Sequence, residues 1–151
     1  MPRIDETRVL PYTPAQMYDL VADVGRYPEF LPWTAAARIR SRTDRGDHEV
    51  MEADLIVGFK GFRESFGSRV SLYPEQRRIE TEYIDGPFRH LKSEWTFRDH
   101  PEGCEVRFWI DFEFRNPILR RVIGAVFDEA MRRTIGAFET RARKLYGSSA
   151  A

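Results

Sequence analysis

The stretch that decides the fold is CEVRFWIDFEFR, residues 104–115, together with the run that follows it to Tyr146. Apolar residues occupy every second position of this stretch, and charged residues stand between them, with Trp109 as the one exception. A period of two is typical of a β-strand that buries one face and exposes the other. Residues 104–115 are therefore predicted to form a half-buried strand.

The periodicity changes at Asn116 and Pro117. Asn is a common helix N-cap, and Pro is common in the first turn of a helix. From Pro117 to Tyr146 the apolar residues recur at helical spacing and share one side of the helix. They are Leu119, Ile123, Val126, Phe127, Ala130, Met131, Phe138 and Leu145. A long helix with one broad apolar face must cover a large apolar surface, and the preceding strand predicts an antiparallel sheet.

The chain before this region starts with a strand and a short helix. A charged strand is predicted at Arg3–Leu10, near an edge of the sheet. Thr13 and Gln16 have the spacing of a capping box, so a helix should start there and run to about Val24, with Gly25 at its end.

Six further strands are expected, at residues 35–43, 49–57, 62–72, 78–84, 91–98 and 104–115. The short turns between them contain Gly and Pro, and such turns force antiparallel pairing. This order predicts an α+β fold, in which a curved antiparallel sheet of about seven strands surrounds a long C-terminal helix. One or two short helices follow the first strand. Residues 1–151 are expected to form a single domain, because the length suits one core and no tract resembles a linker.

Composition narrows the classes of function. Lys and Arg number 24, as do Asp and Glu, so the formal net charge is zero and binding to DNA through a uniformly positive surface is disfavoured. The single cysteine, Cys104, excludes an intramolecular disulfide and fits a reducing compartment. No stretch approaches the length of a transmembrane helix, and the first residues lack an apolar signal region. We therefore expect a cytoplasmic protein.

The three histidines give no sign of catalysis or of metal binding. His48, His90 and His100 have no second histidine or carboxylate at metal-ligand spacing, and no common catalytic or nucleotide-binding motif occurs. We interpret them as surface residues, and we predict no catalytic residue and no metal site.

Glu64 is the carboxylate with the most unusual position. It stands in phase with Phe62 and Phe66, which should face the interior. An acid there must be hydrogen-bonded, neutral or next to a cavity that holds water. Three interpretations remain open: a bulge that turns Glu64 outward, an ion pair with an arginine at the rim of the sheet, and a polar group inside a binding pocket.

The arginines of the last helix invite a membrane or RNA interpretation, because Arg121, Arg132 and Arg143 share one face. However, acids precede several arginines by four positions, which is the favoured order for ion pairs within a helix. The pairs are Asp128–Arg132, Glu129–Arg133 and Glu139–Arg143. A solvated face that carries its own counter-charges is the favoured interpretation.

Two glycines, Gly124 and Gly136, lie inside the same predicted helix. Each costs about 1 kcal/mol relative to alanine. Close approach of another element or an opening over a cavity would explain them, and both explanations remain open.

An aromatic segment lies between the first helix and the second strand. Residues 26–33, RYPEFLPW, hold two prolines within five positions, which excludes a long helix. The segment is predicted to be a loop or a short helical turn that must place large apolar side chains. These are Tyr27, Phe30, Leu31 and Trp33.

MYDLVADV at 17–24, followed by YPEFLPW at 27–33, resembles the opening of the coenzyme Q-binding START-domain family. That family lies within the polyketide cyclase/dehydrase and lipid-transport superfamily. DGPF at 85–88, DFEF at 111–114 and AFETRA at 137–142 continue the resemblance, which spans nearly the whole chain. Thr34 departs from the pattern, since many relatives carry Cys there.

The resemblance implies a helix-grip fold of the START/Bet v 1-like type, in which the sheet wraps the last helix and leaves an apolar tunnel. It also implies a non-enzymatic role, in which ubiquinone or a related polyprenyl lipid is the bound ligand, no further cofactor is required, and respiratory electron transport or quinone biosynthesis is supported. Such a ligand implies transient contact with a membrane surface, peripheral at the inner membrane. Bacterial relatives are ribosome-association toxins, so the ribosome is an alternative partner. An aromatic polyketide cyclase is the third hypothesis.

The predicted ligand site follows from the tunnel. Each buried CH₂ contributes about 0.8 kcal/mol, so a few isoprene units suffice for affinity. The predicted lining is Trp33, Phe62, Glu64, Phe66, Trp95, Phe108, Ile123, Phe127 and Met131, and the predicted entrance is Tyr27, Phe30 and Leu31.

Overall fold

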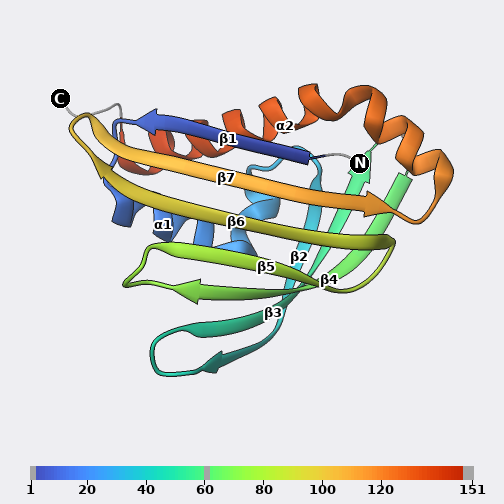
Figure 1. The fold of residues 1–151 in the computed structure, drawn as a ribbon, viewed down its shortest axis with the longest axis horizontal. Coiled ribbons are helices and arrows are strands. Elements are labelled where there is room, and N and C mark those ends of the chain that lie inside the picture. The colour runs from blue at the N-terminus through green and yellow to red at the C-terminus, as the bar shows by residue number, and fades with distance from the viewer. Residues whose placement is uncertain (1–2, 60–61, 148–151) are drawn as a thin grey trace.

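The structure is a computed structural model that describes residues 3–59 and 62–147. Seven strands and three helices make up this part of the chain. In chain order they are β1 (Arg3–Leu10), α1 (Pro14–Ala22), the 3-10 helix η1 (Val24–Glu29), β2 (Thr34–Asp44), β3 (Glu49–Phe59), β4 (Phe62–Tyr73), β5 (Arg78–Asp85), β6 (Phe88–His100), β7 (Gly103–Phe114) and α2 (Pro117–Tyr146). All pairs are antiparallel, in the order β1-β7-β6-β5-β4-β3-β2 (Figure 1). The predicted α+β fold is confirmed, and β1 lies at an edge as expected.

Two helices pack on the sheet. In Figure 1, α1 lies behind β6, and α2 runs behind β1 along the upper edge of the sheet. Their apolar side chains pack against the same face of the sheet. The buried cluster there joins Met17 and Val21 of α1 with Phe97 and Val106 of the sheet and with Phe138 of α2. The half-buried strand predicted at residues 104–115 is confirmed, because the apolar side chains of β7 face the interior.

The start of α1 follows its capping box. The Thr13 hydroxyl accepts a hydrogen bond from the Gln16 backbone N–H at 3.1 Å, and the Gln16 side chain accepts one from the Thr13 N–H at 3.0 Å. The predicted end was wrong. The helix stops at Ala22, and Gly25 lies inside η1 instead. Pro28 has no N–H to continue an α-helix, and a short 3-10 turn accommodates it.

The bounds of α2 match the prediction. The Asn116 side chain accepts hydrogen bonds from the N–H groups of Ile118 at 2.8 Å and Leu119 at 3.4 Å. One member of the predicted apolar face is misplaced, because Leu145 is 50% exposed. In this last turn the contact with α1 is made by Tyr146, whose hydroxyl donates to the Gln16 carbonyl at 3.0 Å.

The outer face of the sheet is held by charged pairs that cross between strands. The shortest pairs join Arg40 to Asp54, Arg42 to Glu49, and Arg107 to Asp5. Such cross-strand pairs stabilise the register of neighbouring strands. The opposite face is apolar, and Cys104 there is 0% exposed, with burial raising the pKa of its thiol to about 11. Cys104 is therefore a core residue, as the sequence indicates.

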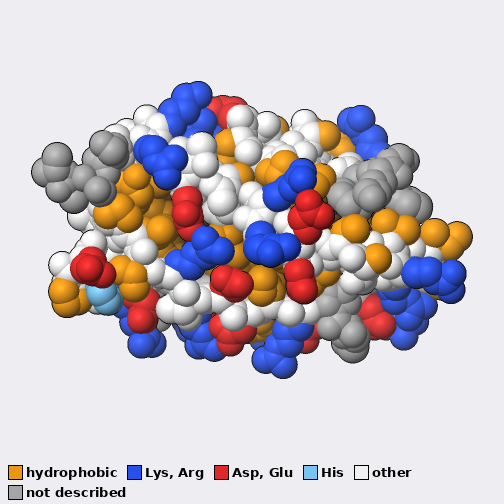
Figure 2. Space-filling model, turned by 90° about the horizontal axis from the view of Figure 1, so that it is seen from above, with side chains coloured by type: hydrophobic (Ala, Val, Ile, Leu, Met, Phe, Trp, Pro, Cys, Tyr) orange, Lys and Arg blue, Asp and Glu red, His pale blue; other side chains and the backbone are white. Residues whose placement is uncertain are grey.

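The expected ion pairs of α2 form only in part. Glu129 and Arg133 pair at 3.0 Å, as predicted. Glu139 pairs instead with Arg8 of β1 at 2.7 Å, because the edge strand runs beside the helix (Figure 1). On the surface seen in Figure 2, basic and acidic side chains are interspersed, which agrees with the zero net charge.

Candidate functional site

The interior between the sheet and α2 contains two neighbouring cavities. Cavity A has a volume of about 230 Å³ and lies between η1, the sheet and the part of α2 that carries Thr134 and Phe138. Cavity B has a volume of about 210 Å³ and lies under α2 between Leu119 and Met131. Five residues line both cavities: Trp33, Val57, Phe66, Leu91 and Ile110. The two cavities are therefore adjacent parts of one apolar space.

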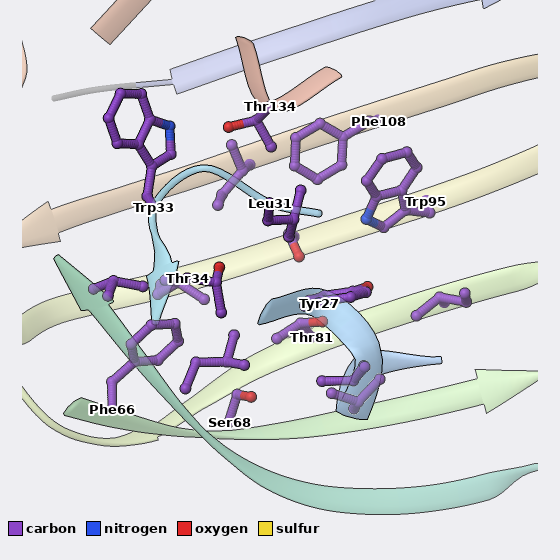
Figure 3. A pocket seen from close by; sticks show the side chains of 18 of the residues that line it. Tyr27, Leu31, Trp33, Thr34, Phe66, Ser68, Thr81, Trp95, Phe108 and Thr134 are labelled. Carbon is purple, nitrogen blue, oxygen red and sulfur yellow. The ribbon is translucent and has the colours of Figure 1, made fainter. Parts of the chain in front are cut away.

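The wall of cavity A combines aromatic rings with hydroxyl groups (Figure 3). The rings of Trp95 and Phe108 are in contact, tilted by 31° with their centroids 4.3 Å apart. The hydroxyls belong to Tyr27, Thr34, Ser68, Thr81, Ser93 and Thr134. The described residues that line cavity A include no carboxylate and no cationic side chain. An uncharged ligand that carries oxygen atoms would suit this wall.

Several of these hydroxyls already have protein partners. Thr134 Oγ1 donates to the Ala130 carbonyl at 2.9 Å, and Ser68 Oγ donates to the Ala53 carbonyl at 3.4 Å. Thr81 and Ser93 differ, since they face each other across β5 and β6 and both border the cavity. This pair of hydroxyls is the best-placed polar contact for a ligand in cavity A.

The wall of cavity B is almost wholly aromatic and aliphatic. Phe88 meets Phe66 edge to face at 5.1 Å and Phe112 at 5.7 Å. Glu64 is the charged side chain on the described lining, and it is half-buried. The register of β3 with β4 runs without a bulge, and no Arg or Lys of the described residues lies within 4.0 Å of the carboxylate. Of the three interpretations, the geometry favours the polar group inside a pocket.

The aromatic segment packs against the C-terminal half of α2. Tyr27 and Phe30 both meet Phe138 edge to face, at 5.6 and 5.3 Å. Arg141 lies over the Phe30 ring at 5.1 Å and pairs with Glu29 at 2.9 Å. Burial raises the pKa of Tyr27 well above its ordinary value, so its hydroxyl stays protonated and donates to the Val21 carbonyl.

Most of the residues predicted to line a site border these cavities. Cavity A is lined by Tyr27, Leu31, Trp33, Phe66, Trp95 and Phe108, and cavity B by Trp33, Glu64, Phe66, Ile123, Phe127 and Met131. Phe30 borders neither cavity and braces α2 instead. The side chain of Phe62 lies outside the described residues. Sequence reasoning missed Thr81 and Ser93, although Ser93 alternates in phase with the inward-facing Leu91 and Trp95.

The histidines lie away from both cavities. His48 stacks on Tyr73 at 4.7 Å, and His90 Nε2 lies 3.2 Å from Asp111 Oδ1. Within residues 3–59 and 62–147, no three His, Cys, Asp or Glu side chains are grouped as metal ligands would be. The site is thus built from apolar, hydroxyl and one carboxylate group.

A curved antiparallel sheet around a long C-terminal helix, with apolar cavities between them, defines the helix-grip class of START-like proteins. The sequence profile described as "Polyketide cyclase / dehydrase and lipid transport" matches residues 10–139, and the chain belongs to this family. The resemblance seen in the sequence is therefore confirmed at the level of the family.

Two curated relatives carry different names. A Rickettsia prowazekii protein named ribosome association toxin RatA is 41% identical over an alignment of 146 residues that covers 92% of this chain and 94% of that protein. The mitochondrial coenzyme Q-binding protein COQ10 homolog B of Xenopus laevis is 33% identical over an alignment of 147 residues that covers 94% of this chain and 58% of that protein.

Solved structures agree on the fold. The solution structure of an 18 kDa protein from Caulobacter crescentus is 36% identical, with a TM-score of 0.83, over 98% of this chain and 100% of that one. The Zhui aromatase/cyclase of a Streptomyces species has a TM-score of 0.81 at 19% identity, over 98% of both chains. At that identity the likeness to the cyclase concerns the fold alone.

Proposed function

We propose that this protein binds a polyprenyl quinone such as ubiquinone, or a related neutral lipid, in cavities A and B and does not alter it chemically. The observation that carries the proposal is the unfilled apolar interior between the sheet and α2. The family includes lipid transport, and one relative is named a coenzyme Q-binding protein.

The chemistry of the walls supports one orientation of such a ligand. The oxygenated ring would lie in cavity A beside Thr81 and Ser93, stacked near Trp95 and Phe108. The tail would extend under α2 into cavity B, where each buried CH₂ contributes about 0.8 kcal/mol. A charged head group in cavity A would lose its hydration without gaining a counter-charge, so fatty acids and phospholipids should bind poorly.

A polyprenyl lipid has to be collected from a membrane. None of the helices in the described part of the chain is both long and apolar enough to span a bilayer. The proposed contact is therefore transient and peripheral, at the surface of the inner membrane.

The test begins with the protein as it is purified. Organic extraction followed by mass spectrometry should release a quinone, and added short-tailed ubiquinone should bind saturably and quench tryptophan fluorescence. Decanoic acid is the matched charged probe and should bind weakly. Absence of both an extracted quinone and saturable uptake overturns the proposal.

The second candidate function is association with the ribosome. It is favoured by the relative named a ribosome association toxin, whose 41% identity spans nearly both chains. It is also favoured by Arg121, Arg132 and Arg143, which are all exposed on α2. Reversing these three charges should then abolish co-sedimentation with the large ribosomal subunit. Reversal of Arg38, Arg63 and Arg98, three exposed arginines of the sheet, is the matched control.

Aromatic polyketide cyclisation ranks last. The cyclase neighbours share the fold at 19% identity and 18% identity. Glu64, the carboxylate of cavity B, would have to serve such chemistry in an otherwise apolar wall.

A further inference from the structure

Trp33 lies where the two cavities meet. Its backbone is fixed to the sheet, because its carbonyl accepts a hydrogen bond from Gly58 N–H of β3 at 2.9 Å. Its indole extends away from β2 toward the segment of α2 that carries Thr134 (Figure 3). There its Nε1–H donates to the Ala130 carbonyl at 3.4 Å. The side chain thus reaches from one edge of the interior to the helix that covers it.

The other residues that border both cavities form the floor beneath this indole. Val57, Phe66, Leu91 and Ile110 come from β3, β4, β6 and β7. These four residues lie on strands of the sheet, whereas Trp33 lies in the loop before β2. The indole therefore lies at the border between cavity A and cavity B.

The volumes of the two cavities limit the size of the ligand that each can hold. Pockets that hold small molecules usually measure about 300–1,000 Å³. Cavity A, at about 230 Å³, and cavity B, at about 210 Å³, each fall below this range, whereas the joined space lies within it. A compact ring fits cavity A alone, but a ring with a tail needs both cavities.

The contact of the indole with α2 is one that a ligand can replace. The donor–acceptor distance of 3.4 Å is beyond the ordinary range for N–H···O bonds. The same Ala130 carbonyl also accepts the Thr134 hydroxyl at 2.9 Å, so it stays satisfied when the indole leaves.

We propose that Trp33 determines which ligand lengths the protein accepts. This inference rests on the proposed lipid-binding function. Ligands confined to cavity A bind with the indole in place. Ligands with a tail displace the indole from Ala130 in order to enter cavity B.

Quinones with one ring and tails of increasing length test this inference by isothermal titration calorimetry. Because Trp33 lines cavity A, Trp33→Ala should bind the tail-less quinone more weakly than the wild type does. The ratio of its affinities for tailed and tail-less quinones should exceed the wild-type ratio about fivefold, because a tail no longer has to displace the indole. Trp33→Phe should lie between the two. Ile79→Ala is the matched control, because Ile79 borders cavity A only and its removal opens no path to cavity B.

A second measurement follows the indole itself. The chain has three tryptophans, so fluorotryptophan labelling gives three ¹⁹F resonances, and the Trp33→Phe variant assigns one of them. Both quinones place a ring in cavity A beside Trp33, but the tailed quinone should shift the Trp33 resonance further than the tail-less quinone does, because it also displaces the indole. Trp109, on the outer face of the sheet, is the internal control.

The outcomes separate the two proposals. If no quinone binds to the wild type or to any variant, the proposed function fails and the length selection fails with it. If the series binds but the wild type and Trp33→Ala depend equally on tail length, or both quinones shift the Trp33 resonance alike, the role of Trp33 alone is refuted.

Discussion

Glu64 places a carboxylate in the apolar wall of cavity B. Burial of a charge without a partner is unfavourable for folding. We therefore expect Glu64→Leu to raise the free energy of unfolding by roughly 1 kcal/mol at pH 7, as measured by urea denaturation. Glu64→Gln, which keeps the shape and removes the charge, should give a smaller gain. A destabilised Leu variant would show that the carboxylate has a structural partner.

Thr81 and Ser93 are expected to hold the ring of the ligand. Thr81→Val combined with Ser93→Ala should weaken binding of a tail-less quinone by about fivefold if one hydrogen bond is lost and by about 25-fold if two are lost. Binding of a pure hydrocarbon probe should not change. Thr96→Val is the matched control. It makes the same substitution on the opposite face of β6, so it should leave quinone binding unchanged. Equal losses for quinone and hydrocarbon would contradict the assignment.

At the residue scale the sequence revealed the apolar members of the site and left the polar ones unseen. Trp95 and Phe108 are recognisable because large apolar residues at alternate positions must face a core. Thr81 and Ser93 carry no such signal, since a small hydroxyl residue is common on either face of a strand. Their importance depends on a cavity, which is a property of volumes summed over many distant side chains.

The glycines of α2 can be interpreted at the scale of the element. A Cβ added to Gly124 or Gly136 would meet no atom within 4 Å, so close approach of another element does not explain them. Gly124→Ala should therefore raise the free energy of unfolding by about 1 kcal/mol, the difference in helix propensity.

The control for this prediction is Gly103→Ala at the start of β7. Gly103 has φ +137, and its added Cβ would collide with the Leu10 carbonyl. This variant should be destabilised in the same urea denaturation experiment. Destabilisation of both variants would show that α2 depends on the absence of a side chain at Gly124.

The bounds of elements with one regular hydrophobic period were predicted within a few residues. The wrong bounds lie where two local signals, such as a glycine and a nearby proline, favour different structures. The bounds of α2 agree because Asn116 and Gly147 mark both ends. Gly25 was predicted to end a helix, but it lies inside η1. The 3-10 conformation of η1 accommodates Pro28, which an α-helix would not. Leu145 was assigned to the apolar face because helical periodicity does not reveal where the covered surface ends.

For the whole molecule, the ion pairs of the outer face predict a dependence of stability on pH. Hydrogen bonds from Arg40 and Arg107 lower the pKa values of Asp54 and Asp5 below their ordinary 3.8. A carboxyl whose pKa is lower in the folded state stabilises the protein above pH 3.8, and this contribution disappears as the pH falls through the lowered pKa.

Urea midpoints should consequently drop as the pH falls below about 4. The drop should be smaller for Asp54→Asn combined with Asp5→Asn, which have no proton to gain. Added salt should also reduce the drop, because exposed pairs are screened. An unchanged drop in the double variant would assign the acid sensitivity to other groups.

At the scale of the whole molecule, the packing of the sheet around α2 was predictable from the sequence. The presence of two adjacent cavities between them was not. An amphipathic helix and alternating strands leave few arrangements that bury both apolar faces. The border between the two cavities includes the indole of Trp33, whose position depends on the loop before β2 and on its contact with Ala130 of α2. Short-range sequence patterns carry no information about that position.

The position of β1 has a consequence for the order in which the chain acquires its structure. β1 pairs with β7, and its Asp5 bonds to Arg107, 102 residues later. During synthesis the first strand must therefore wait, unpaired, until β7 has been made. Contacts between distant segments slow folding, and the exposed edge is prone to aggregation in the meantime. Translation should be the stage at which the protein most needs a chaperone, and pausing the ribosome before β7 emerges should prolong that need.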